Sequence, residues 1–309
     1  MSPATYRRIT IAALVAVYLI VVTGASVRLT GSGLGCADWP NCNSSRFIDV
    51  STTHGAVEQV NRLFTGIVMV AVVAAVLGAI RRRPRRRDLT RLAILIALGV
   101  PMQGFVGAIV VLTHLNPFAN QQHFLLSMVL VALATVLVSR AGEPDEGSRT
   151  PTVTRPTALH VRAVVALTGL ALVTGTFVTG AGPHAGDEKA KRFHVAISSM
   201  ARVHSIAVLA TIGVAIALLW RLRGRRVDRL VLDNSITTWM VLAVAQAGIG
   251  YTQYFSGVPA LLVGVHVTLA TALWLATVQL QLATSAVIRT TVPFGSAASP
   301  ASAARVPSA

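Results

Sequence analysis

The stretch that decides the fold reads Thr53-His54-Gly55-Ala56-Val57-Glu58-Gln59-Val60-Asn61-Arg62-Leu63-Phe64-Thr65-Gly66. It leads into an apolar run that ends near Ile80, so Glu58, Asn61 and Arg62 lie in the first turns of a helix long enough to cross a bilayer. Glu58 is the only carboxylate that falls inside an apolar segment, and an ionisable group at that depth is costly and marks a functional site by default. An ion pair with Arg62, one turn on, is the structural alternative, and it does not exclude chemistry.

Composition indicates the class of protein. Hydrophobic residues make up 53% of the 309 residues, charged residues make up 12%, and the mean hydropathy is +0.66. These values predict an all-α integral membrane protein rather than a soluble domain. The net charge of +16 could suggest nucleic acid, but the arginines cluster in short loops between apolar segments. We therefore expect no nucleic-acid partner.

Eight apolar segments have the length of a membrane span. The first is not expected to be a cleaved signal peptide, because it is long and lacks a convincing small-residue cleavage site. The expected spans are residues 9–28, 56–80, 90–113, 120–139, 159–181, 195–220, 235–254 and 259–283.

Arginine in the loops predicts the orientation. Arginines are frequent before the first span and in the loops between spans two and three, four and five, and six and seven. The loops 29–55, 114–119, 182–194 and 255–258 carry few. We therefore expect a multi-pass protein of the cell membrane, with both termini in the cytoplasm and the cysteine-containing loop on the outer face.

The chain repeats itself. Val22-Thr23-Gly24 closes the first span and Val173-Thr174-Gly175 closes the fifth. One offset of 143 residues takes Gln103 to Gln246, His123 to His266 and Asn61 to His204. Four spans per half, an even number, predict two pseudo-symmetric four-helix bundles in parallel topology. The expected divisions are an N-terminal repeat 1–140, an unstructured cytoplasmic linker 141–157, a C-terminal repeat 158–285 and a disordered tail 286–309.

Two histidines in the second half fall at one depth. His204 is roughly nine residues into span six and His266 about seven into span eight, and these spans run in the same direction. Two imidazoles so placed on facing helices are typical of a bis-histidine haem. A single intramembrane histidine would favour an interhelical hydrogen bond instead. The pairing and its recurrence in the repeat favour haem.

The first half repeats this arrangement imperfectly. His123 matches His266, but Asn61 stands where the second half has His204. An amide is a poor iron ligand, so this half is expected to hold iron through one protein ligand, or to take a second from His54 in the preceding loop. We hypothesise that the saturated half stores electrons and that the half beside Glu58 carries the substrate chemistry.

The two cysteines, Cys36 and Cys42, lie in an outer loop. On the oxidising side of a membrane they are expected to form a disulfide. A structural staple over the bundle and a redox role are equally compatible with this spacing. Arg28, Arg62 and Arg202 lie near outer ends of spans, where a guanidinium could hold a haem propionate or simply reach toward the interface.

These motifs together resemble the haem A synthase family. The resemblance rests on Arg28-Leu29-Thr30, the loop from Ser32-Gly33-Leu34-Gly35-Cys36 through Asp38-Trp39-Pro40 to Cys42, and Glu58-x-x-Asn61-Arg62, and it covers residues 5–285. It implies oxidation of the C8 methyl group of haem O to the formyl group of haem A for cytochrome c oxidase.

The resemblance also implies roles for individual residues. His204 and His266 would ligate a resident haem b, His123 the substrate haem O or product haem A, and Glu58 would be the catalytic glutamate. Cys36–Cys42 would be the family's disulfide. Many members carry histidine where this chain has Asn61, which puts the second ligand of the substrate haem in question.

Two other classes of function compete with this reading. A di-haem cytochrome b-like electron-transfer protein predicts two saturated haem sites, and a transporter built on repeats leaves the histidines unexplained. The candidate partners are haem O, a haem O synthase, an electron acceptor, membrane lipid and further copies of the chain in a homo-oligomer. The arginine-rich loops also suit anionic lipid.

Overall fold

A computed structural model of the chain describes residues 1–288. In these residues eight helices are long and apolar enough to cross a membrane, as predicted. They are α1 (Pro3–Leu29), α2 (Thr53–Arg81), α3 (Arg87–Leu112), α4 (Pro117–Ala141), α5 (Arg155–Ala181), α6 (Ile197–Arg223), α7 (Arg226–Phe255) and α8 (Ala260–Leu282), with the strands β1 (Ser148–Pro151) and β2 (Ser285–Ile288).

Local sequence sets several helix starts. Thr52 caps α2, because its hydroxyl accepts a hydrogen bond from the Gly55 N–H at 3.0 Å. Asn116 caps α4 by accepting from the Phe118 N–H at 2.9 Å, and Pro117 follows in the first turn. The Thr52 cap matters for function, because it fixes the start of the helix that carries Glu58.

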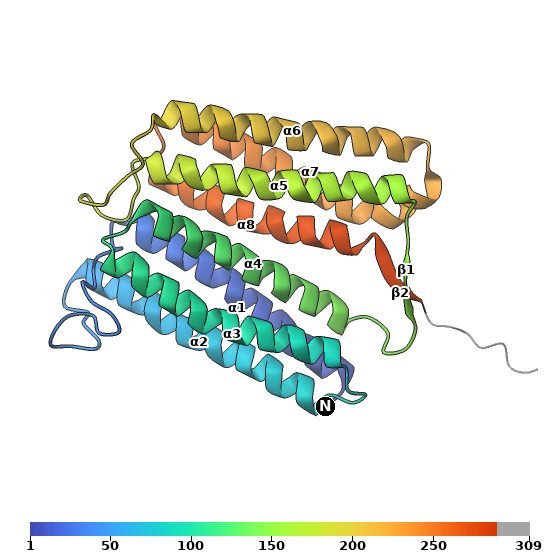
Figure 1. Cartoon of the computed structure of the whole chain (residues 1–309), viewed down its shortest axis with the longest axis horizontal. Coiled ribbons are helices and arrows are strands. Elements are labelled where there is room, and N and C mark those ends of the chain that lie inside the picture. The colour runs from blue at the N-terminus through green and yellow to red at the C-terminus, as the bar shows by residue number, and fades with distance from the viewer. Residues whose placement is uncertain (289–309) are drawn as a thin grey trace, which may run out of the picture.

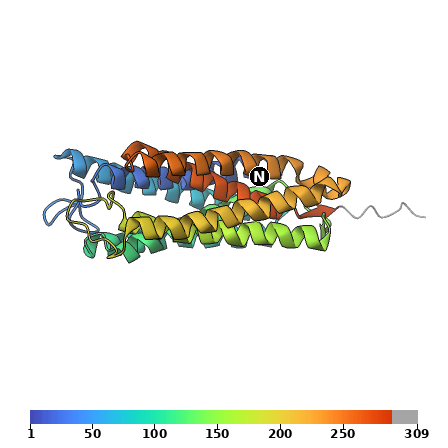
Figure 2. The same cartoon turned by 90° about the horizontal axis from the view of Figure 1, so that it is seen from above.

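The helices form two four-helix bundles (Figure 1). In the first bundle α1 packs on α2, α2 on α3, α3 on α4 and α4 on α1, and α5 to α8 close a second ring in the same order. Each bundle has its own buried apolar cluster, one around Val72 and Val131 and the other around Leu218 and Ile236. Figure 2 shows the helices of both bundles running along one common direction.

Hydrogen bonds donated by side chains join the two bundles along α1, α4, α5 and α8. The Tyr18 hydroxyl donates to the Thr268 carbonyl at 2.9 Å, and the Trp274 indole N–H donates to the Met128 carbonyl at 2.9 Å. The Gln121 amide donates to the Thr176 hydroxyl at 2.7 Å. Such bonds hold helices together where apolar packing cannot distinguish a neighbouring helix from lipid.

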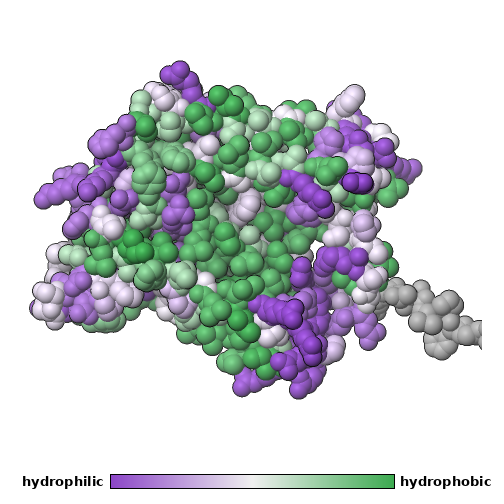
Figure 3. Space-filling model, viewed as in Figure 1, coloured by the Kyte–Doolittle hydropathy of each residue, from purple (hydrophilic) through white to green (hydrophobic). Residues whose placement is uncertain are grey.

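The surface agrees with a membrane-spanning molecule. Figure 3 shows a hydrophobic band across the middle of the visible face and hydrophilic residues at both ends. Large apolar side chains of the spanning helices are exposed, among them Leu98 of α3, Val241 of α7 and Leu261 of α8. The N-terminus, β1 and β2 lie at one end of the bundles, and the long loop between α1 and α2 lies at the other (Figure 1).

The prediction of an unstructured linker at 141–157 is wrong in part. Residues 148–151 form β1, which pairs antiparallel with β2, so that Ser148 faces Ile288 and Pro151 faces Ser285. The strands pair because each offers backbone groups that the other satisfies, a partnership that composition does not reveal. Residues 286–288 of the predicted tail therefore belong to β2, while the rest of that prediction, 289–309, lies outside the described residues.

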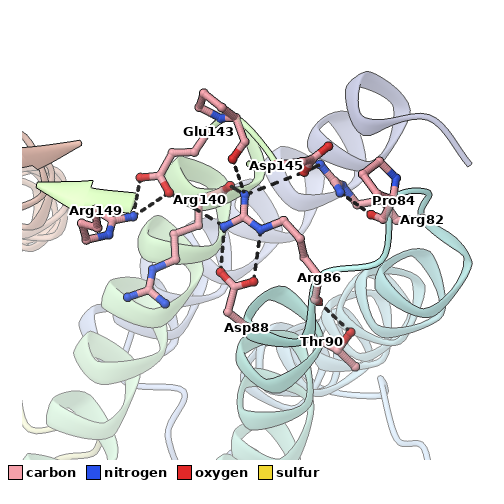
Figure 4. Close-up of polar contacts among 10 residues, drawn as sticks. Arg82, Pro84, Arg86, Asp88, Thr90, Arg140, Glu143, Asp145 and Arg149 are labelled. Carbon is pink, nitrogen blue, oxygen red and sulfur yellow. Dashed lines mark hydrogen bonds and ion pairs between the residues drawn. The ribbon is translucent and has the colours of Figure 1, made fainter. Parts of the chain in front are cut away.

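A cluster of ion pairs fastens the same end of the first bundle (Figure 4). Arg86 pairs with Asp88 at 2.8 Å and donates to the Arg140 carbonyl at 3.1 Å. Arg82, almost fully buried, pairs with Asp145 at 2.5 Å. The hydrogen bonds that Arg86 donates to the Asp88 carboxylate raise the pKa of the Arg86 guanidinium. These arginines are thus structural at the start of α3 and the end of α4, beyond any role in setting orientation.

Replacing Asp228 by alanine is expected to destabilise the second bundle. Asp228 of α7 is 3% exposed and accepts hydrogen bonds from the Thr154 N–H (3.1 Å) and from the hydroxyls of Thr154 (2.7 Å) and Thr157 (2.6 Å) at the start of α5. Leaving buried donors unpaired costs about 1–3 kcal/mol. Thermal unfolding in detergent measures the loss.

Asp233→Ala is the matched control for Asp228→Ala. Asp233 lies on the same helix, its side chain is 60% exposed and it pairs with Arg229 only at 3.9 Å. An exposed pair contributes about 0–1 kcal/mol, so this variant should melt close to the wild type. Equal melting temperatures for the two variants would contradict a stabilising role for the hydrogen bonds between Asp228 and the start of α5.

Candidate functional site

One cavity collects the residues singled out in the sequence. It has a volume of about 910 Å³ and is lined by residues of both bundles. A volume of this size lies at the upper end of the range for small-molecule and cofactor sites. The predicted site residues on its wall are Glu58, Asn61, His123, His204 and His266. Neither cysteine lines it, but Trp39, Pro40 and Phe47 of their loop do.

The two histidines of the second bundle face each other. The ring centroids of His204 and His266 are 6.5 Å apart, with an angle of 81° between the rings. The Thr174 hydroxyl lies 3.1 Å from His204 Nδ1, and the Gln246 amide lies 3.1 Å from His266 Nε2. Within residues 1–288, His266 Nδ1 is buried without a hydrogen-bond partner.

Glycines make room for the histidine rings. Each of the three cavity histidines packs against a glycine of a neighbouring helix, at positions that the repeat relates. A Cβ on the glycine would lie 3.4 Å from the histidine Cε1 for Gly107 and His123, 3.2 Å for Gly175 and His204, and 2.9 Å for Gly250 and His266. A Cβ at Gly250 would force the His266 ring to shift and one at Gly175 would crowd His204, whereas one at Gly107 would make an ordinary contact with His123.

In the first bundle His123 faces the cavity without a histidine partner. Gln103, the repeat counterpart of Gln246, donates to the His123 carbonyl at 3.1 Å. The Thr23 hydroxyl donates to Asn61 Oδ1 at 2.8 Å, which repeats the contact of Thr174 with His204. His54 is exposed, contacts the Ser32 hydroxyl through Nδ1 at 2.9 Å and does not line the cavity. The alternative that His54 supplies a ligand is therefore not supported.

Glu58 lies at the junction of the cavity and the outer loop. It is 5% exposed. Its Oε2 accepts a hydrogen bond from the Cys36 N–H at 2.8 Å, and its Oε1 accepts from Arg62 at 2.6 Å. The predicted i,i+4 ion pair with Arg62 therefore forms. Oε1 also accepts a hydrogen bond from Arg62 Nε at 3.0 Å, so both of its lone pairs are used. Oε2 accepts only the Cys36 N–H among these bonds, so it is the oxygen at which Glu58 can accept a proton.

Arg62 connects Glu58 to the cysteine loop. Its second guanidinium arm donates to the carbonyls of Asp38 at 3.0 Å and Asn41 at 3.1 Å. Nearby, hydrogen bonds from Ser51 and Asn43 hold the pKa of Asp49 below its ordinary value and fasten the far end of the loop. The loop therefore positions the Glu58 carboxylate through its backbone N–H and carbonyl groups. Sequence motifs do not reveal such backbone contacts.

The cysteines form the predicted disulfide, Cys36–Cys42. Both residues are buried, with exposed fractions of 0% and 2%. Buried sulfurs are poorly accessible to thiols, while the Cys36 N–H holds Glu58 directly. This geometry favours the staple over the redox role.

Replacing both cysteines by serine is expected to loosen the loop and the Glu58 side chain together. Closing so short a loop contributes about 2 kcal/mol in the chain-entropy model. Unfolding in detergent, with and without a reductant, measures the effect. Reductant should lower the stability of the wild type and leave the double variant unchanged. A variant of normal stability that has lost turnover would instead favour a redox disulfide.

Some of the other histidines and cations contact the cavity and some do not. His160 and His184 bond to backbone carbonyls, of Pro156 and Val258 respectively, both at 2.8 Å, and neither lines the cavity. The cations that do line the cavity are Arg28, Arg62, Lys191 and Arg202. This end of the cavity therefore suits an anionic group.

Sequence reasoning missed the partners of the histidines. The repeat already contains these partners, Thr23 with Thr174 and Gln103 with Gln246. Their role as hydrogen-bond partners is seen only when α1 packs on α2, α3 on α4, α5 on α6 and α7 on α8. The signal that could have found them is the repeat itself. A polar residue that recurs at the offset of a histidine is a candidate neighbour of that histidine.

Comparison with known proteins identifies the family. The chain matches the sequence model of the COX15-CtaA family, described as cytochrome oxidase assembly protein, over residues 7–53 and 47–278. The chain belongs to this family. The COX15-CtaA match runs through both bundles into α8 and confirms the resemblance stated from the motifs.

Relatives of this chain carry the name haem A synthase. One from Lysinibacillus sphaericus (strain C3-41) is 32% identical over 171 residues, which is 54% of this chain and 56% of the relative. One from Listeria monocytogenes (strain ATCC BAA-679 / EGD-e) is 32% identical over 165 residues, 52% of this chain and 54% of the relative. One from Geobacillus kaustophilus (strain HTA426) is 34% identical over 123 residues, 39% and 38% of the two chains. The match thus spans about half the length of the first two relatives.

Proposed function

We propose that this chain is a haem A synthase, an oxidoreductase that converts the C8 methyl group of haem O to the formyl group of haem A for cytochrome c oxidase assembly. The observation that carries the proposal is one cavity to which Glu58, His123 and the pair His204 and His266 all contribute. Membership in a family of cytochrome oxidase assembly proteins and relatives named haem A synthase support it.

The second bundle fits a resident haem b. Metal–imidazole bonds are about 2.0–2.1 Å long in zinc proteins, so ring centroids 6.5 Å apart leave room for one metal atom between His204 and His266. Thr174 beside His204 Nδ1 fixes that ring, as partners of ligating histidines do. When bound there, haem b supplies a centre that accepts and passes on single electrons.

The first bundle fits the substrate. His123 offers an imidazole with a buried, unpartnered Nδ1 within residues 1–288, on the wall of a cavity lined mostly by apolar side chains. The cations Arg28, Arg62, Lys191 and Arg202 at the loop end suit the propionate groups of a haem. In this proposal His123 positions haem O, and the cavity excludes bulk water from the methyl group.

Glu58 is the residue proposed to act on the methyl group. Conversion of a methyl to a formyl group takes two successive two-electron oxidations: overall, the methyl group and one water give the formyl group, four protons and four electrons, which pass to the electron acceptor. Positive charge develops at the carbon as electrons leave it, and protons are then released. A carboxylate fixed by the Cys36 N–H and by Arg62 can take up such a proton at Oε2 and can stabilise the charge without reorganising. Arg62 and the loop are positioning groups in this scheme.

The orientation and partners form part of the proposal. The arginine-rich end, which carries the N-terminus and β1 with β2, lies in the cytoplasm, and the Cys36–Cys42 loop lies on the outer face of the cell membrane. The partners are haem O, a haem O synthase that delivers it, an electron acceptor, anionic lipid at the arginine-rich end and further copies of the chain.

Chromatography of the non-covalent haems extracted from the purified protein tests the proposal. Haem b together with haem O or haem A is expected. Haem b alone at two per chain would favour the di-haem electron-transfer protein, and a protein without haem would favour the transporter. Asn61, which lacks an imidazole, already weighs against two bis-histidine sites.

A further inference from the structure

The repeat contains a fourth glycine, and it faces open space. Gly24 in α1 is the counterpart of Gly175 in α5, where a Cβ would lie 3.2 Å from Cε1 of His204. A Cβ on Gly24 would meet no atom within 4 Å. Because Asn61 stands in place of a histidine, its shorter side chain leaves unfilled the volume that an imidazole takes up in the second bundle. Gly24 and Asn61 both line the cavity, so this volume opens into it.

The open volume has polar groups on its wall. Thr23 donates to Asn61 Oδ1 at 2.8 Å, which orients the amide. In the part of the chain that the structure describes, no acceptor is hydrogen-bonded to Asn61 Nδ2, so its N–H groups are available to a molecule in the cavity. The Thr23 hydroxyl corresponds to that of Thr174, which contacts His204 Nδ1 at 3.1 Å. The first bundle thus retains the threonine that contacts the imidazole in the second bundle, although it has asparagine in place of the histidine.

The volume faces His123 by the symmetry of the repeat. His266 and His204 face each other in the second bundle, and the same offset relates them to His123 and Asn61. Glu58 lies one turn before Asn61 on α2 and lines the same cavity. Glu58 is paired with Arg62 at 2.6 Å, which offsets its charge. The surroundings therefore suit a small molecule that accepts a hydrogen bond from the Asn61 amide.

We propose that Thr23, Gly24 and Asn61 form a binding site for a small ligand with a nitrogen or oxygen lone pair, of the size of water to imidazole, which occupies the place of the missing histidine opposite His123. The site rests on the proposed function, since it needs a haem held by His123. In the first bundle the ligand opposite His123 would then be exchangeable. In the second bundle His204 and His266 occupy both corresponding places, so no exchangeable ligand is expected there.

Titration of the haem-loaded protein with imidazole, followed by visible absorbance, tests the site. The wild type is expected to show a saturable shift from high-spin to low-spin haem in the component that His123→Ala removes. Asn61→His fills the volume, so this component should be low-spin without imidazole and should need at least about tenfold more imidazole for any change. Asn61→Ala, which leaves the volume open, should still bind imidazole. If Asn61→His responded to the same imidazole concentrations as the wild type, the proposal would be overturned.

A transplant to the second bundle gives an independent test. His204→Asn removes the same imidazole as His204→Ala, but it creates the same combination of glycine, threonine and asparagine beside His266. After reconstitution with excess haem b, a second imidazole-responsive component is therefore expected. An unresponsive wild type and an unresponsive His204→Asn protein, both with haem present by extraction, would overturn the ligand site and leave the synthase standing. An imidazole-responsive protein that holds only haem b would keep the ligand site and overturn the synthase.

Discussion

His204→Ala is expected to remove haem b from the purified protein. The substitution deletes one of two facing imidazoles whose ring centroids are 6.5 Å apart, and it leaves a void beside Gly175. Loss of a residue that only supports a metal ligand costs about 10–100-fold in metal affinity. Loss of the ligand itself should exceed that range. Extraction and chromatography measure the haem b remaining per chain.

His160→Ala is the matched control for this loss. His160 also lies on a helix of the second bundle, but it bonds to the Pro156 carbonyl, is not buried and does not line the cavity. This variant should keep its haem b. The assignment of the resident haem to the second bundle would fail if His204→Ala retained full haem b content, or if both variants lost it equally.

Glu58→Gln is expected to lower haem A formation by about 10²–10⁴-fold, the usual contribution of a positioned acid or base. Glutamine keeps the size of the side chain and can still accept the Cys36 N–H, so the loop should hold its place. It cannot take up a proton as a carboxylate does. Haem A in membranes, measured by chromatography against total haem, gives the effect, and haem b content should stay at the wild-type level.

Glu188→Gln controls for the loss of one carboxylate at the same end of the molecule. Glu188 is exposed and does not line the cavity, so this variant should form haem A normally. If Glu58→Gln lost haem b along with activity, Glu58 would be a structural partner of Arg62 and the catalytic role would be withdrawn.

The sequence predicts the helical framework well for a physical reason. Crossing a bilayer requires about 20 consecutive apolar residues, and such segments can be recognised from the sequence without knowledge of any tertiary contact. The depth of His204 and His266 follows from helix geometry, and their pairing follows from the repeat. The i,i+4 contact of Glu58 with Arg62 is equally local and forms as expected.

What escaped prediction depends on contacts between distant segments. β1 and β2 pair across more than a hundred residues, and each strand has only four residues, too few to be recognised alone. The Cys36 N–H that holds Glu58 is a backbone group without a sequence signature. Likewise, the open space at Gly24 appears only when α1 and α2 are packed together.

The most direct test of the synthase assignment is the appearance of haem A in a host that makes haem O but no haem A. Expression of the wild-type chain should produce haem A in extracted membranes, and expression of Glu58→Gln at equal level should leave haem O in its place. If the wild-type protein accumulated with haem b bound and no haem A formed while haem O was present, the chain would not be a haem A synthase.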